Sequence, residues 1–444
     1  MTDASRDITY ARVGAIALPV VLSNAMIPLQ GAIDTAIIGN LGETSFLAAV
    51  ALGAAVIQLL FVVFNFLQMG VSGLAAQALG AGDGRRLMNT LVRAGVIALM
   101  IAAALIVLKL PLRTGALALF EGSAEARALG AVYVDIRIWG APAELMNYAL
   151  MGWFAGQGQT RRLFEMQLVI SVINIALNLY FVLVLGWGVA GVALGTVIAS
   201  FCGLGFGLWR MRARAAQVVP AGWRIEWGRI LRGDELAQVM ALNRDIMIRT
   251  LLLVGSFTWM TRLGSTQGDV ILAANGILLQ FVFIASHGLD GFAMAAEALV
   301  GQSLGARSRA RLRRAVVVSS LSALMLAALV SIFFTALAEP MIRLFTNVEA
   351  VRAAAAAHAP WATLMPVVAV LAYQLDGVFI GATAGPQMRN AMIVASGVFV
   401  PLGWLMTEAM GNHGLWAAMW IWMALRAGTL ALAYPALEAR AGPA

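Results

Sequence analysis

Acidic side chains lie inside long apolar stretches of this sequence, where a charge is costly. Asp34 stands late in the first stretch, four residues after Gln30, so the two side chains share one face of a helix. Apolar surroundings favour the neutral form of a carboxyl group, which lets such an acid take up and release a proton. We therefore predict that Asp34 is a protonation switch. The alternative is that it lies near the outer surface or caps a neighbouring helix.

The same stretch contains two residues that weaken a helix. Pro28 has no N–H to donate to the carbonyl of Asn24, and Gly31 follows closely. The pattern predicts a hinge at Pro28 and Gly31, close to Asp34. An acid beside a hinge is what a proton-coupled switch requires.

Two amides on the fifth apolar stretch also share a helical face. Asn174 and Asn178 are four residues apart, and buried amides of this kind either link helices or line a polar cavity. We expect them to line a substrate cavity together with Gln30, Met26 and Tyr148. Methionine suits an adaptable apolar pocket because its side chain is flexible.

The second half of the sequence has its own set of polar residues. His287, Asp290 and Glu297 lie at offsets of three and seven, on one stripe of a helix. They form either a second proton site or a structural tie, in which Asp290 pairs with Arg249 or Arg426. His287 taken alone is typical of a packing residue.

Asp376 resembles Asp290 because a glycine follows each of them. Its carboxylate either binds a cation or the substrate, or makes a packing hydrogen bond. Arg249 stands near Arg244 and Asp245, and we expect these three to pair locally or to meet lipid head groups.

The composition indicates the class of protein, and hence the kind of helices, that contains these residues. Of the 444 residues, 61% are apolar and only 12% are charged, far from the average of soluble proteins. This excludes a soluble enzyme, a disordered chain and a nucleic-acid-binding domain, and it predicts an integral membrane protein. The single Cys202 and three scattered histidines argue against a metal site, and no cofactor is expected.

Apolar runs between charged residues predict an all-α protein with twelve transmembrane helices. They cover approximately residues 13–38, 46–70, 88–110, 127–155, 163–185, 189–210, 236–261, 270–300, 314–337, 353–381, 388–410 and 413–436. Twenty of the thirty basic residues fall in the N-terminal tail and in alternate connections, and Arg137 is counted with the opposite connections. The excess of positive charge on one side predicts that both termini are cytoplasmic.

The chain also repeats itself at a constant offset. Residues 79–87 match residues 304–312 at five of nine positions, and at the same offset Gly152 and Gly156 match Gly377 and Gly381. We predict two homologous six-helix lobes, residues 1–210 and 236–444, joined by a basic cytoplasmic linker, residues 211–235. An even number of helices in each lobe places the pseudo-twofold axis along the membrane normal, and a substrate cavity between the lobes is a hypothesis.

Absent motifs narrow the function further. The sequence has no phosphate-binding loop of the ATPase type, and Lys109 is its only lysine. The motor of an ATP-driven pump is therefore excluded, and an ion gradient is the expected energy source. No nucleophile and base are paired as in an enzyme.

Several motifs resemble the MATE (multidrug and toxic compound extrusion) family, in its bacterial DinF (DNA-damage-inducible protein F) branch. They are Leu18-Pro19 with Asp34-Thr35-Ala36, Leu289 to Ala293, Asp376 to Ala382, Met388 to Asn390 and Gly411 to Trp416. The resemblance covers essentially the whole chain. It implies a V-shaped, monomeric antiporter of the bacterial inner membrane, surrounded by lipid, that exports toxic organic compounds, often cations. The first-helix acid of that branch matches Asp34.

The sequence departs from some relatives in ways that bear on the coupling ion. Relatives with a second acid in the N-terminal half have it where this chain has Asn178, and sodium-coupled relatives have a seventh-helix acid that is missing here. The first departure argues against a two-acid proton site in this half, and the missing seventh-helix acid favours protons over sodium. A sodium-coupled antiporter and a flippase for lipid-linked intermediates are the alternatives.

Overall fold

The computed structural model describes residues 7–39, 44–118, 123–219, 224–225, 227–230 and 233–442. Throughout these ranges the regular structure is helical, and no strand occurs in them. The predicted all-α fold class is confirmed.

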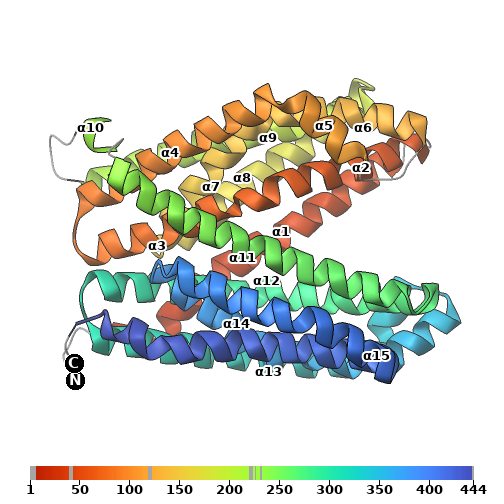
Figure 1. The fold of residues 1–444 in the computed structure, drawn as a ribbon. Coiled ribbons are helices and arrows are strands. Elements are labelled where there is room, and N and C mark those ends of the chain that lie inside the picture. Colours follow the sequence, from red (N-terminus) through yellow and green to blue (C-terminus); the bar gives the residue numbers. More distant parts are fainter. Residues whose placement is uncertain are drawn as a thin grey trace. The chain divides into compact units, whose positions relative to one another are not determined.

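Figure 1 shows the helices, labelled in the order of the chain. Their bounds are α1 Tyr10–Gly39, α2 Thr44–Val62, α3 Phe66–Gly80, α4 Gly84–Val107, α5 Lys109–Ala118, α6 Ala124–Arg137, α7 Ala141–Gly156, α8 Thr160–Leu179, α9 Gly188–Val218, α10 Trp227–Ile230, α11 Gly233–Ser265, α12 Asp269–Gly305, α13 Arg309–Phe345, α14 Glu349–Gly381 and α15 Gly385–Ala439. Single 3₁₀ turns join α2 to α3 and α6 to α7, and a π-helical turn, Tyr180–Val184, extends α8.

Ten helical segments in the described residues are long and apolar enough to cross a membrane. The last of them, Gly385–Ala439, has a non-helical residue at Gly411 and is therefore two helices joined at a kink. The segment Ala124–Gly156 adds one more. A 3₁₀ turn at Ile138–Gly140 divides this segment into α6 and α7. Together these segments account for the twelve predicted helices.

The repeat seen in the sequence is present in the helices and turns. The sequence repeat has an offset of 225 residues, since residue 79 matches residue 304. Four helices of the first half begin 225 residues before a helix of the second half: α2 before α12, α4 before α13, α6 before α14 and α8 before α15. The turn after α7 has an N–H of Gly158 bonded to Ala155 O at 2.8 Å, and the turn after α14 has Thr383 bonded to Ile380 O at the same distance. The chain thus contains two homologous six-helix halves.

By its internal packing the chain divides into two compact units. Unit 1 comprises the described residues of Met1–Val21, Gly80–Gly82 and Met240–Ala444, and unit 2 those of Leu22–Leu79 and Asp83–Val239. The boundary falls inside α1, a continuous helix whose first part, up to Val21, belongs to unit 1.

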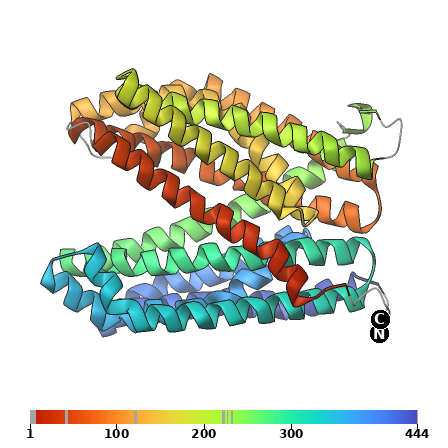
Figure 2. The same ribbon diagram turned by 180° about the vertical axis from the view of Figure 1, so that it is seen from behind.

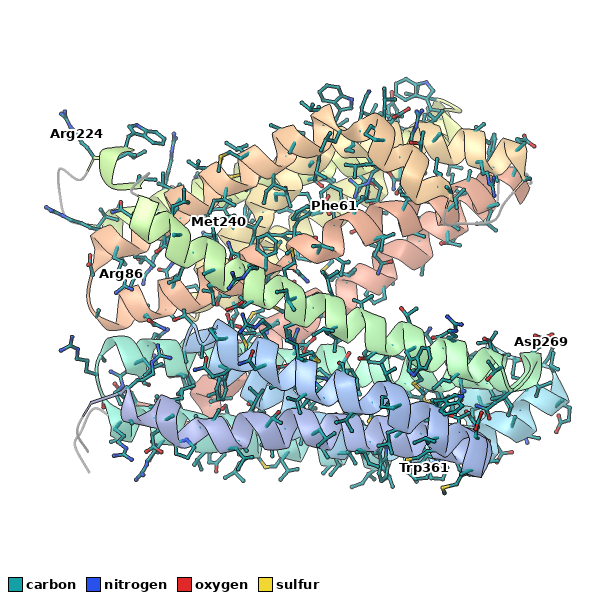
Figure 3. The ribbon with its side chains drawn as sticks, viewed as in Figure 1. Phe61, Arg86, Arg224, Met240, Asp269 and Trp361 are labelled. Carbon is teal, nitrogen blue, oxygen red and sulfur yellow. The ribbon has the colours of Figure 1, made fainter. Side chains whose placement is uncertain are left out.

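Unit 1 is built around three long helices that pack against one another, α12, α13 and α14 (Figures 1 and 2). Aromatic residues fill its core, with Trp416, Trp422, Phe281 and Phe399 fully buried. Met240 lies near the start of α11 and Asp269 just beyond its far end, so α11 runs the length of the unit (Figure 3).

In unit 2, α8 packs on α9, α4 packs on α7 and α2 packs on α6. Glycines let α7 approach α3 closely: a Cβ at Gly152 would lie 2.2 Å from Gln68 O, and one at Gly156 would lie 2.2 Å from Ser72 O. Helix α7 also packs on α9 and α8, the pair that carries the buried amides.

Candidate functional site

Asp34 lies in the part of α1 that belongs to unit 2, with its side chain half-buried. One carboxylate oxygen, Oδ1, accepts a hydrogen bond from Asn178 Nδ2 of α8 at 2.7 Å. A bond between an amide and a carboxylate is charge-assisted, so it stabilises the ionised form of the acid. The predicted switch residue is therefore tied directly to a second helix.

Two neighbours hold Asn178 in place. Its Nδ2 also reaches Asn174 Oδ1 at 3.2 Å, while Asn174 Nδ2 donates to Thr196 Oγ1 of α9 at 2.9 Å. Gly195 of α9 lies against the Asn178 side chain, since a Cβ there would be 2.1 Å from Asn178 Oδ1. Both asparagines are completely buried. They link α1, α8 and α9, and they support Asp34 from the side of unit 2.

Gln30, one turn before Asp34, makes a second link between the same two helices. Its Oε1 accepts a hydrogen bond from Ser171 Oγ of α8 at 3.0 Å, and Gln167 Nε2 donates to the same hydroxyl at 3.3 Å. Met26 lies one further turn back and is half-buried. The structure thus brings Asp34, Gln30 and the two predicted asparagines into one α1–α8 contact.

The hinge residues do not interrupt α1 in this structure. The helix is continuous from Tyr10 to Gly39 and passes through Pro28 and Gly31. Both residues are exposed, and Thr35 Oγ1 donates to the carbonyl of Gly31 at 2.8 Å.

Arg137, at the end of α6, is a site residue that sequence reasoning missed. The expectation that it lies in a connection is wrong, because its side chain is 7% exposed and its Nη2 donates to Glu144 Oε2 of α7 at 3.3 Å. Its charge acts on Asp34 and on Tyr133. Tyr148, half-buried one turn after Glu144, experiences both charges of the pair. The spacing of seven between Arg137 and Glu144 was the available signal, since it places both on one helical face.

In unit 1 the buried Asp376 of α14 is engaged by two arginines. Its Oδ2 accepts hydrogen bonds from Arg249 of α11 and from Arg426 Nη2 of α15, the latter at 2.7 Å. The local pairing expected for Arg249 is wrong, because α11 directs this side chain into the unit, where it is 9% exposed. Asp245, by contrast, pairs with Arg244 and with Arg389 of α15.

The two acids of the stripe on α12 differ in their exposure. Asp290 is exposed, while Glu297 is buried two turns later. His287 Nδ1 contacts the carbonyl of Phe283 in its own helix at 2.6 Å. The charges of His287, Arg249 and Arg426 act on Asp290, although the hydrogen bonds of the two arginines go to Asp376. The structure therefore assigns the inter-helix tie to Asp376 in place of Asp290.

The described residues contain no group of three or more His, Cys, Asp or Glu side chains that could hold a metal ion.

Comparisons with known proteins agree with this architecture. The MatE family model matches residues 19–180 and 246–405 of the chain. The DNA damage-inducible protein F of Escherichia coli (strain K12) is 36% identical over 94% of this chain and 90% of its own length. The chloroplastic Protein DETOXIFICATION 44 of Arabidopsis thaliana is 27% identical over 93% of this chain and 80% of its length.

Solved structures share the fold. One described as the outward-facing conformation of a multidrug resistance MATE family transporter of the MOP superfamily matches with a TM-score of 0.87, at 18% identity, over 97% of this chain and 96% of that one. The family model covers most of the chain in two segments, and the relative from Escherichia coli covers nearly all of it. The chain therefore belongs to the MATE family and is a multi-pass membrane transporter of the multidrug efflux type.

Proposed function

We propose that the chain is a proton-coupled exporter of amphipathic, often cationic organic compounds, with Asp34 as its protonation switch. The observation that carries this proposal is the 2.7 Å hydrogen bond from Asn178 Nδ2 to Asp34 Oδ1. Charge-assisted hydrogen bonds are roughly twice as strong as neutral ones. Proton uptake by Asp34 therefore weakens the link between α1 and α8, and proton release restores it.

Proton and substrate compete for the same carboxylate in this scheme. A cationic compound is attracted to ionised Asp34 and is released when a proton neutralises the acid. Gln30, Met26 and Tyr148 are half-buried and have surface left for a ligand, whereas Asn174 and Asn178 are completely buried. We assign the first three to contact with the compound and the two asparagines to positioning Asp34.

Protons are favoured over sodium by the surroundings of Asp376. A sodium site needs oxygen ligands that are not already neutralised. Asp376 is engaged by two guanidinium groups, from Arg249 and Arg426. To bind Asp376, Na⁺ would have to displace the guanidinium group of Arg249 or Arg426. A sodium-coupled exporter is the alternative that the experiment below must exclude.

The proposal includes the setting of the protein. We place it as a monomer in the bacterial inner membrane, in contact with lipids, with both termini cytoplasmic, no cofactor and no catalytic activity. Two lobes, residues 1–210 and 236–444, flank the linker 211–235. One charge that crosses 100 mV releases about 2.3 kcal/mol, so a proton gradient is a sufficient energy source.

The test is transport in proteoliposomes. The wild type and Asp34→Asn are reconstituted, and movement of ethidium, a fluorescent organic cation, is followed after a pH gradient is imposed, with a sodium gradient in a parallel arm. We expect the wild type to respond to the pH gradient alone. Asp34→Asn cannot ionise, and its transport should fall to the rate of protein-free liposomes.

Two variants control for folding and for loss of charge in general. Asp34→Glu keeps a protonatable group and should retain part of the activity. Asp135→Asn removes an acid of unit 2 that pairs with Arg113 outside the site, and it should transport normally. The proposal is wrong if Asp34→Asn transports like the wild type, or if the sodium gradient drives transport in place of the pH gradient.

A further inference from the structure

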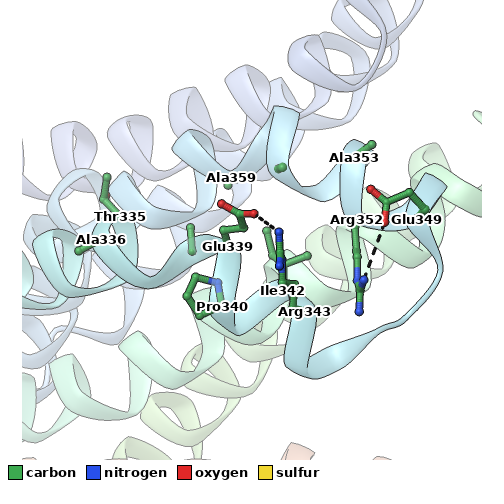
Figure 4. A pocket seen from close by; sticks show the side chains of 12 residues that line it. Thr335, Ala336, Glu339, Pro340, Ile342, Arg343, Glu349, Arg352, Ala353 and Ala359 are labelled. Carbon is green, nitrogen blue, oxygen red and sulfur yellow. Dashed lines mark hydrogen bonds and ion pairs between the residues drawn. The ribbon is translucent and has the colours of Figure 1, made fainter.

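A pocket of about 600 Å³ opens in unit 1 between the end of α13 and the start of α14 (Figure 4). Alanines form much of its wall, and four charged residues lie around it: Glu339, Arg343, Glu349 and Arg352. None of the residues in the proposed transport site lines it.

The sequence explains why this space is open. Pro340 lies inside α13 and has no N–H to donate to the carbonyl of Ala336, and both residues line the pocket. On the facing helix, α14, the lining residues are the small Ala353, Ala356 and Ala359. Small side chains next to a proline-disturbed turn leave room that a larger residue would fill.

The surroundings of the pocket are those of a membrane surface. The preceding turns of α13 expose large apolar side chains, among them Leu329, Ile332 and Phe333, as expected of a helix that faces hydrocarbon. Arg343 is two residues from the end of the helix. Charges that follow an apolar stretch at a helix end lie at the level of lipid head groups.

The pocket lies at the end of α13 opposite the chain's C-terminal helix end. The start of α13 is bound to that end, because Arg309 and Arg313 pair with Glu438 of α15. The helix has 37 residues, which corresponds to about 55 Å. The pocket thus faces the leaflet on the other side of the membrane from Glu438.

The charges around the pocket form two ion pairs, each between one arginine and one glutamate. Arg343 Nη2 lies 2.5 Å from Glu339 Oε1, and Arg352 Nη1 lies 3.8 Å from Glu349 Oε2 (Figure 4). Arg352 Nε also donates to Thr346 O at 2.8 Å. The side chains of Glu339, Arg343 and Glu349 are 70%, 64% and 87% exposed, so they can reach a ligand.

We propose that this pocket binds the head group of a phosphatidylethanolamine molecule from the adjacent leaflet. The phosphate takes hydrogen bonds from the two arginines, and the ammonium donates to the two glutamates. The alanines of the pocket accommodate the start of an acyl chain. A lipid with a net negative charge fits less well, because two exposed carboxylates face it and no ammonium compensates them.

The repeat provides a matched control. The equivalent positions in the first half are Thr114, Ala118, Ala124 and Arg127, so that half keeps only the counterpart of Arg352. Arg127→Gln removes an arginine at the equivalent position without touching the pocket.

The test is native mass spectrometry of the purified full-length protein with equal amounts of phosphatidylethanolamine and phosphatidylglycerol. We expect the wild type and Arg127→Gln to retain mainly phosphatidylethanolamine. The double variant Arg343→Gln/Arg352→Gln should retain at least roughly five-fold less phosphatidylethanolamine than the wild type. Glu339→Gln/Glu349→Gln should reverse the preference toward phosphatidylglycerol, because only the arginines remain.

Thermal unfolding of each variant shows whether it is folded. If the arginine double variant is unfolded, the lipid preference of the glutamate double variant decides whether the proposal holds. The proposal is overturned if the folded arginine variant retains phosphatidylethanolamine like the wild type. It is overturned equally if the wild type binds both lipids alike or if the glutamate variant keeps the wild-type preference.

Discussion

The two halves of the chain share a backbone plan but differ in the chemistry that they place on it. A Cβ at Gly152 would lie 2.2 Å from Gln68 O, and one at its counterpart Gly377 would lie 2.2 Å from Ala293 O, which is the equivalent carbonyl. Gly156 and Gly381 repeat the relation with Ser72 O and Glu297 O. Close helix packing is therefore built twice in the same way.

The polar contact between α1 and α8 is not built twice. The positions equivalent to Asp34 and Asn178 are Trp259 and Gly403. There the indole Nε1 donates to Val400 O at 3.1 Å, and a Cβ at Gly403 would lie 3.7 Å from that nitrogen. A titratable link in one half corresponds to a fixed aromatic contact in the other.

Conversely, the Asp376 cluster has no counterpart in the first half. Asp376 and its two arginines occur where the first half has Met151, Asn24 and Phe201. Duplication thus preserved the helix contacts, while each half acquired its own buried charges. This difference suits the proposed division of roles, in which Asp34 titrates during transport and Asp376 holds helices together.

The largest expected effect tests that division of roles. Asp376→Asn leaves the buried Arg249 and Arg426 without a compensating charge, which should cost about 3 kcal/mol of stability. Thermal unfolding in detergent measures the loss. Asp34→Asn should unfold near the wild-type temperature, and Asp135→Asn, which breaks a partly exposed pair, should cost less than about 1 kcal/mol. Equal stability of Asp376→Asn and Asp135→Asn would contradict the structural role.

The next effect tests the shared backbone plan. Gly152→Ala and Gly377→Ala each force a methyl group against a carbonyl oxygen, so each should destabilise the protein by about 1–3 kcal/mol. Gly397→Ala in α15 is the control, because a Cβ there has open space. Thermal unfolding of the three variants should show similar losses for the first two. A loss in only one half would mean that the two glycine contacts are not equivalent.

A smaller effect tests the support of Asn178. Gly195→Ala places a Cβ 2.1 Å from Asn178 Oδ1, and the amide must move away from Asp34. Since that bond favours the carboxylate, its loss should shift the pH midpoint of transport upward by roughly one unit. Asn178→Ala should give the same shift. Gly205→Ala, also on α9 but in open space, should leave the pH profile unchanged. If the pH profile of transport is the same in Gly195→Ala as in the wild type, Gly195 does not support the position of Asn178.

The smallest effect concerns the turns. Gly82 and Gly158 adopt a φ of +70°, and their equivalents in the second half are Arg307 and Thr383, each with a φ of +51°. This conformation is unfavourable for a β-branched residue. Thr383→Gly should therefore stabilise the protein by up to about 1 kcal/mol, and Gly158→Thr should destabilise it by a similar amount. Calorimetry that finds Gly158→Thr neutral would show that the turn tolerates side chains in both halves.

The number of helices and the repeat could be predicted from sequence because apolar length and turn residues determine them. Helix ends were less accessible: α13 runs from Arg309 to Phe345 where residues 314–337 were expected, because charged residues continue a helix beyond the apolar core. The break in the fourth helix at Ile138–Gly140 and the short helix α5 were not predicted.

The partners of buried charges were beyond sequence reasoning. In a chain with apolar residues on every helix face, periodicity does not tell which face packs inward. Arg426 could be named as a partner for an acid, but whether it meets Asp290 or Asp376 depends on how α12, α14 and α15 pack. Asp34 and Asn178 stood out individually, since each is polar within an apolar stretch. Their mutual bond follows only from the packing of α1 on α8.

The membership of α1 in two units has a consequence for dividing the chain. Its first part belongs with unit 1, where Arg314 Nε donates to Ile8 O at 2.7 Å and a Cβ at Gly291 would lie 2.8 Å from Ala17 O. If the gene were split in the linker, the C-terminal fragment would lack a helix segment that completes its packing. The C-terminal fragment could then complete its packing only by binding the start of α1 from the N-terminal fragment. Domain-swapped proteins exchange an element between chains in the same way.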